Sequence, residues 1–174
     1  MEVPIWQSNY LDPEVRVDDE SDFFPLLIPT EPVVAGKEPN LVQVEDEGEV
    51  RVVGRNGGTK LGGPFQTVTF LESGPLWLGI PGSYTPAIIA CSGKLWAIRG
   101  YTTPHACHGV IRGIIWHKAI MKTTKIRDDV ESSEQVGLFE GTPISSTNAA
   151  GFSHGAFEFI VELAGSAPQD GARP

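Results

Sequence analysis

A serine flanked by glycines is the strongest candidate for covalent chemistry in this 174-residue chain. Residues 151–155, GFSHG, fit the G-x-S-x-G pattern that exposes a nucleophilic serine, here Ser153, on a strand-to-helix turn of α/β-hydrolases. A triad is defined by geometry, so its base and acid need not follow in the usual chain order. The candidate partners are three histidines and two aspartates: His105, His108, His154, Asp128 and Asp129.

The context of Ser153 does not favour an α/β-hydrolase. Residues 147–150, TNAA, do not read as the buried strand that should lead into the serine, and only 19 residues follow Gly155. The alternative is an ordinary loop serine that leads into a strand. The sequence therefore favours a protein that is not an enzyme, with a small serine hydrolase as an alternative.

Cysteine and histidine lie close together around residue 107. His105, Cys107 and His108, with Cys91 and His117 not far along the chain, are residue types that bind zinc. The chain has no C-x-x-C pair and no standard zinc spacing. Cys107 and His108 are adjacent, and neighbours on a strand point to opposite faces, which disfavours a thiol–imidazole pair. We predict no metal site and no cofactor; the two cysteines are able to pair, but nothing in the sequence requires it.

Aromatic side chains are a third possible site. Trp77, Trp96 and Trp116 lie in apolar stretches with strand character. Exposed tryptophans on a sheet stack against sugars, whereas buried ones fill the core. A carbohydrate- or protein-binding β module is thus a further alternative.

The elements that position these residues have the pattern of short strands. Residues 65–71 alternate, with Val68 and Phe70 on one face and Thr69 and Leu71 on the other, and residues 156–164 alternate apolar residues with Glu158 and Glu162. Residues 108–127 form the longest β-branched run, which predicts a long strand buried on both faces in its first half. Residues 127–135 are polar and predict a loop or one short helix. We therefore expect an all-β fold: an antiparallel β-sandwich or jelly roll, or a partly open barrel, with at most one short helix.

Pro- and acid-rich stretches suggest the domain organisation. We expect an extended arm or linker over 1–34, a β domain over 35–168 and a disordered tail over 169–174. No apolar run reaches the ~18 residues of a membrane span. The sequence thus predicts a soluble protein without a membrane span.

Charge is segregated along the chain. Residues 1–50 have a net charge of −11, residues 51–127 of +9 and residues 128–174 of −7. The simplest interpretation is that acidic ends pack over a basic middle, or that the bases form a solvated face. Nucleic acid is a possible partner of the basic segment 112–127 but is not favoured, because its bases are not interleaved with aromatic residues. We further expect Ile111, Ile114 and Ile115 to be buried, and Lys122, Lys125 and Arg127 to reach solvent or the acidic ends.

Three stretches resemble capsid proteins of picorna-like RNA viruses, of the insect iflavirus and dicistrovirus type. Residues 110–120, VIRGIIWHKAI, are similar to the aromatic-R-G-S strand of their jelly rolls, although Ile114 stands at the serine position. Residues 156–168 resemble their last strand, and residues 1–10 their V-E-V-P segment, which in the family follows the R-G strand. The resemblance implies a structural capsid protein or its projecting domain, located in the virion, with copies of itself or other capsid proteins as partners.

Overall fold

The chain folds almost entirely into β-strands. The computed structural model describes residues 1–8, 14–62, 65–97, 106–151 and 154–164. The described part contains no α-helix, only two short 3-10 turns, η1 (Asp46–Gly48) and η2 (Thr147–Ala150). The predicted all-β class is confirmed.

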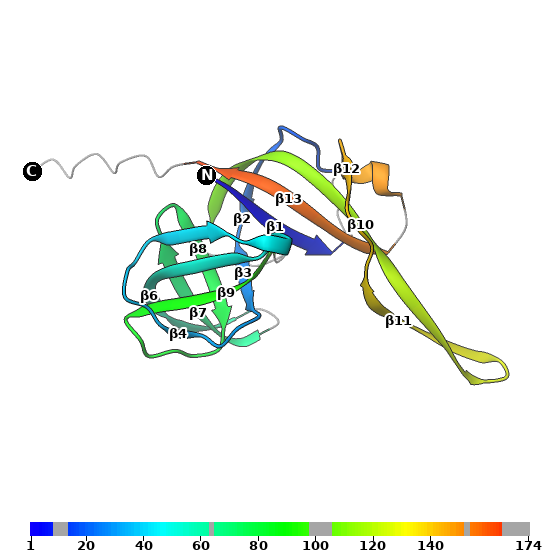
Figure 1. Ribbon diagram of the computed structural model, residues 1–174, viewed down its shortest axis with the longest axis horizontal. Helices are drawn as coiled ribbons and strands as arrows, with labels where there is room; N and C mark the ends of the chain where they lie inside the picture. The colour runs from blue at the N-terminus through cyan, green and yellow to red at the C-terminus, as the bar shows by residue number, and fades with distance from the viewer. Residues whose placement is uncertain (9–13, 63–64, 98–105, 152–153, 165–174) are drawn as a thin grey trace, which may run out of the picture.

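Thirteen strands form one continuous hydrogen-bonded sheet that curls on itself (Figure 1). The strands are β1 (Glu2–Ser8), β2 (Glu20–Phe23), β3 (Pro25–Pro29), β4 (Val34–Ala35), β5 (Leu41–Val44), β6 (Val50–Gly62), β7 (Phe65–Ser73), β8 (Leu76–Pro81), β9 (Ile88–Ala97), β10 (Cys107–Arg127), β11 (Val130–Leu138), β12 (Thr142–Ile144) and β13 (Gly155–Leu163).

Part of the sheet closes into a barrel through β9. The first half of β9 pairs with β6 and its second half pairs with β3, which gives the closed circuit β9-β3-β8-β7-β6-β9. Gly93 is the residue at which the partner changes, because it pairs with Val50 of β6 and Pro29 of β3. A barrel is one of the architectures expected from the sequence, and here the circuit is complete.

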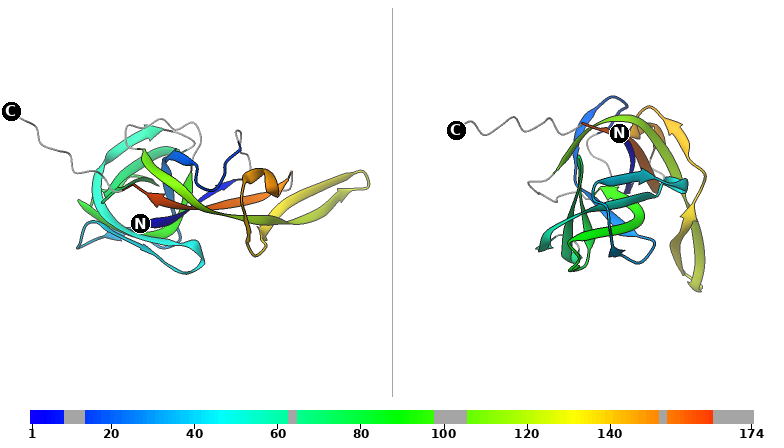
Figure 2. Two further views of the ribbon diagram at one scale, coloured as in Figure 1. Left: turned by 90° about the horizontal axis from the view of Figure 1, so that it is seen from above. Right: turned by 60° about the vertical axis from the view of Figure 1, so that its left-hand side comes forward.

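A second group of strands extends from the barrel. β1 contacts β9 in parallel at Trp6 and Trp96, β13 pairs with β1, and β10 pairs with β13. Beyond β13, β10 continues as a two-stranded hairpin with β11 that projects away from the barrel (Figure 1; Figure 2, left). Asp128 and Asp129 form its tip. The short helix considered for residues 127–135 is therefore replaced by this hairpin.

The main hydrophobic core fills the barrel and continues under the extension. It joins fully buried residues of β1, β8 and β9 to Ile111 and Ile114 of β10 and Phe159 of β13. A smaller cluster on the other face of β3 and β7 contains Phe24, Leu26, Val68 and Phe70. Val68 and Phe70 thus lie opposite Leu71, as the alternation of this stretch predicts.

Residues 1–34, expected as an extended arm or linker, belong to the sheet. Val3 and Ile5 of β1 and Leu26 and Leu27 of β3 have no exposed surface. Its strands β1 and β3 are paired with β13, β9 and β8. The predicted tail over 169–174 lies outside the described residues.

The long central strand exists but is buried on one face rather than two. Cys107 and Ile111 are buried, whereas the residues that follow each of them, His108 and Arg112, are exposed. A register shift at Gly113 then turns Ile114 and Trp116 inward.

The expected change from buried to exposed residues along this strand is largely confirmed. Ile111 and Ile114 are 1% and 2% exposed and Ile115 is half-buried. Lys122, Lys125 and Arg127 are exposed.

A substitution at Gly93 tests the close approach of β9 to β3 that closes the barrel. A Cβ at this position would overlap the carbonyl oxygen of Ile28 on β3. We expect Gly93→Ala to lower the free energy of unfolding by about 2 kcal/mol, because the two backbones must separate where β9 changes partner. Urea denaturation followed by tryptophan fluorescence measures the change.

Gly113→Ala is the matched control, since a Cβ there would lie at 3.4 Å from the nearest atom, Ile160 Cγ1. A loss in Gly93→Ala no larger than in Gly113→Ala would contradict the close approach at Gly93.

Candidate functional site

The residues proposed for a serine hydrolase are spread over the molecule. Ser153 and His105 lie outside the described residues. His108 is at the start of β10, whereas Asp128 and Asp129 follow its end, so the strand separates them by roughly 60 Å at ~3.3 Å per residue. His154 is exposed, and its main-chain carbonyl accepts a hydrogen bond from the Ala119 N–H. Neither aspartate therefore orients His108, and nine residues of strand separate Asp128 from the neighbourhood of His154.

His108 pairs instead with the acidic strand β2. Its Nδ1 lies 2.8 Å from Asp22 Oδ1 and its Nε2 lies 3.7 Å from Glu20 Oε2, all on exposed side chains. Four residues along β10, Arg112 contacts Glu162 of β13 and, at 3.0 Å, Asp18. The hydrogen bonds that Arg112 donates to Glu162 and Asp18 raise the pKa of Arg112. Acidic residues from both ends of the chain thus contact the first part of β10, whereas its four bases from Lys118 onward are exposed.

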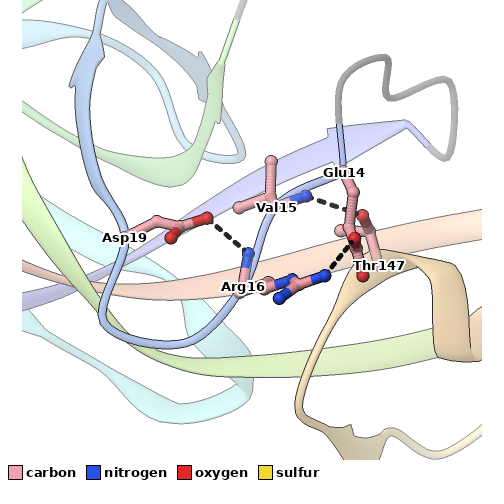
Figure 3. A network of polar contacts seen from close by, with 5 residues as sticks. All are labelled: Glu14, Val15, Arg16, Asp19 and Thr147. Carbon is pink, nitrogen blue, oxygen red and sulfur yellow. Dashed lines mark hydrogen bonds and ion pairs between the residues drawn. The ribbon is translucent and has the colours of Figure 1, made fainter.

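A network of polar contacts holds the segment before β2, residues 14–19, against η2 (Figure 3). The Val15 N–H donates to Thr147 Oγ1 at 3.0 Å, and the Arg16 N–H donates to Asp19 Oδ2 at 2.8 Å. Arg16 also pairs with Glu14 at 2.8 Å, and this hydrogen bond lowers the pKa of Glu14. Because Thr147 is buried and bonded to backbone, the network anchors a loop and offers no free reactive group.

Both cysteines are buried free thiols. Cys107 holds β8 beside β10: its Sγ accepts a hydrogen bond from the Trp77 N–H at 3.1 Å and donates to the Trp77 carbonyl at 3.2 Å. Burial raises the pKa of Cys107, and it raises the pKa of Cys91 to about 12. The thiols are therefore protonated at neutral pH, and Cys107 and His108 point to opposite faces as predicted.

The three predicted tryptophans differ in exposure. Trp116 is buried and packs on Phe157, with ring centroids 4.8 Å apart, so it fills the core rather than a binding surface. Trp77 and Trp96 are half-buried. Trp96 lies beside Trp6, whose ring centroid is 6.1 Å away, and Lys94 Nζ lies 4.5 Å from the Trp6 ring.

A histidine–glutamate pair lies next to these aromatic rings. His117 Nε2 is 2.9 Å from Glu158 Oε2, and the two side chains are only 15% and 13% exposed. His117 Nδ1 is 3.2 Å from the carbonyl oxygen of Phe139, and the imidazole ring lies tilted by 37° against the Trp6 ring, with centroids 4.7 Å apart. Both ring nitrogens thus face oxygen atoms, a carboxylate at Nε2 and a main-chain carbonyl at Nδ1.

This pair joins β10, β13 and the turn before β12. The hydrogen-bond partners of His117 in the described part are a carboxylate and a carbonyl, so the histidine activates no hydroxyl or thiol there. The pairing of His117 with Glu158 is not apparent from the sequence, because the two residues are 41 positions apart. The only signal was that Glu158 and Glu162 share the polar face of an otherwise apolar strand.

No cluster of three or more His, Cys, Asp or Glu residues suited to a metal ion occurs among the described residues. Within the same part of the chain, no helix is long and apolar enough to cross a membrane.

The outer part of the β10–β11 hairpin is the most exposed feature. Every residue from Met121 to Val136 is exposed. The strands are in register from Met121–Gln135 to Lys125–Glu131, and Thr123 Oγ1 lies 3.0 Å from Ser133 Oγ. This ribbon, residues 121–136, makes no pairing in the described part except between its own two strands.

Comparison with models of protein families, with curated proteins and with solved structures finds no match for this chain. A functional assignment must therefore be argued from the geometry.

A substitution at Gly141 tests how closely the side chain of His117 is packed. A Cβ at this position would lie 2.6 Å from His117 Cε1 and would overlap Ile115 Cγ2. We expect Gly141→Ala to reduce the free energy of unfolding by about 1–3 kcal/mol, because it displaces His117 from Glu158. Gly137→Ala is the control, because its Cβ would meet Ile120 Cδ1 at 3.6 Å. Equal stabilities of the two variants in urea would show that the ring is not confined.

The thiols provide a second test. In native protein at pH 8, Cys91 and Cys107 should react with a disulfide reagent at least a hundredfold more slowly than in denaturant, because both are buried and protonated. The pKa of Cys91 is raised above its ordinary 9.0, so unfolded chains lose this proton first as pH rises. The free energy of unfolding should therefore fall from about pH 9 upward; fast labelling of native protein would contradict the burial.

Proposed function

We propose that this chain is a structural protein that works by protein–protein assembly, as a capsid subunit or capsid-associated domain located in a virion. The observation that carries the proposal is the projecting ribbon. An isolated two-stranded hairpin is marginally stable in water, and open strand edges are templates for pairing with another chain. A ribbon held away from the barrel suits a role in contacting other proteins.

The arrangement of the strands supports the capsid interpretation. The three stretches that resemble picorna-like capsid proteins become β1, β13 and β10, which are consecutive neighbours in the sheet. Segments that are far apart in the sequence thus form one surface, from which the ribbon continues. The ion pairs of Arg112 with Asp18 and Glu162 also lower the positive charge available to a nucleic acid.

Removal of the ribbon tests this function. Ile120 and Gly137 are paired across the hairpin, so Met121 to Val136 can be replaced by a two-residue Asn-Gly turn. The wild-type chain should form oligomers in a concentration series measured by light scattering, and the shortened chain should remain a monomer. Its melting temperature should change by only a few degrees, because the removed residues are exposed.

A monomeric wild-type chain at all concentrations would contradict the proposed function. Oligomers that persist in the shortened chain would show that assembly uses another surface.

A further inference from the structure

The two strands of the ribbon each have one edge available for pairing. β13 covers one edge of β10 only as far as Lys118, and in the described part β11 has no neighbour other than β10. Register shifts skip Ile126 near the tip and Val136 near the base. Between them lies a regular ladder of five residue pairs, Met121–Lys125 with Glu131–Gln135. Bulges disturb an edge, so this regular section is the part best suited to pair with another strand.

Neither face of the ladder is apolar. One face carries Met121, Thr123 and Lys125, and the other carries Lys122 and Thr124, with Ser, Glu and Gln opposite them on β11. A docking protein would find no hydrophobic face to cover. Main-chain hydrogen bonding at the edges is therefore the interaction that the ribbon can offer.

Charge distinguishes the two edges. The β10 side of the hairpin, residues 118–127, carries four bases and no acid, whereas residues 128–135 carry four acids and no base. The hairpin as a whole is neutral, which argues against a polyanion as its partner. Within the chain, Lys122 is paired with Glu134 and Lys125 with Glu131.

The three ways of pairing two copies differ in their charge contacts. Pairing β10 with β10 places bases beside bases, and pairing β11 with β11 places acids beside acids; like charges on neighbouring strands are destabilising. Pairing β11 with β10 of the next copy places acids beside bases. If the register within the chain is repeated between chains, each of Lys122 and Lys125 lies between two glutamates.

We propose that the partner of the ribbon is a second copy of this chain, bound by pairing the acidic β11 edge of one copy antiparallel to the basic β10 edge of the next. This inference rests on the proposed assembly function and specifies its contact. The contact is head-to-tail, because each copy binds one neighbour through its β10 edge and the other neighbour through its β11 edge. Repetition of this contact closes a ring or extends a filament. The ribbons of successive copies form one continuous antiparallel sheet.

A charge-transposed chain tests the pairing. The variant Lys122→Glu, Lys125→Glu, Glu131→Lys, Glu134→Lys keeps both charge pairs within the hairpin, so the ribbon itself still folds. It should assemble with itself as wild type does, because acidic and basic edges still alternate. When wild type and ¹⁵N-labelled variant are unfolded together and refolded, native mass spectrometry should show mixed oligomers at least about tenfold below the statistical fraction, because every mixed contact joins like charges.

The matched control transposes two neutral residues, Thr123→Ser with Ser133→Thr, and should mix statistically with wild type. Statistical or preferential mixing of the charge-transposed chain would overturn the proposed pairing, because β11-to-β11 contacts would favour mixing. Failure of the transposed chain to assemble, while retaining its fold by circular dichroism, would also overturn it. In both cases the assembly of wild type would still stand, whereas a monomeric wild type would overturn the assembly function together with this contact.

Discussion

The change of partner along β9 is the constraint on which the architecture depends. One strand pairs with β6 through its first half and with β3 through its second half, and Gly93 takes part in both ladders. The contact is close enough that a single Cβ would meet the backbone of β3. Because β9 also contacts β1 at Trp96, it connects the barrel to the extension. Loss of this strand would open the barrel and remove its sheet contact with β1.

The extension is stabilised in two different ways along its length. Near the barrel, the inner face of β10 is buried with β13, while ion pairs to Asp18, Asp22 and Glu162 cover the outer face. Single exposed ion pairs contribute little to stability, so the apolar face provides most of it there. Beyond Ile120, the burial ends, and only the ladder with β11 and opposite charges across it remain. The strand therefore passes from the buried core into a fully exposed ribbon within one element.

Alternation of apolar and polar residues made much of the fold predictable. Residues 65–71 and 156–164 each have a buried face, so both strands and their inward residues were identified from the sequence. β11 was missed because V-E-S-S-E-Q has no buried face and thus no alternation. Asn56-Gly57, which is typical of a tight turn, instead lies at an irregularity inside β6.

The site depended on information that a single sequence lacks. His117 and Glu158 meet only because β10 and β13 pair with Trp116 opposite Phe157. The register between distant strands is decided by the whole core rather than by local residues. For the same reason, residue type alone does not show which candidates are close in space. His108 and Asp128, for example, lie at opposite ends of β10.

The position of β1 has a consequence for biosynthesis. Glu2 pairs with Glu162, and β1 lies between β9 and β13 in the sheet. During translation, the first strand must wait for partners that emerge about 90 and 160 residues later, so its apolar residues stay without their native neighbours for most of synthesis. A topology of this kind favours slow, post-translational completion of the fold, and it makes the nascent chain a natural client for chaperones.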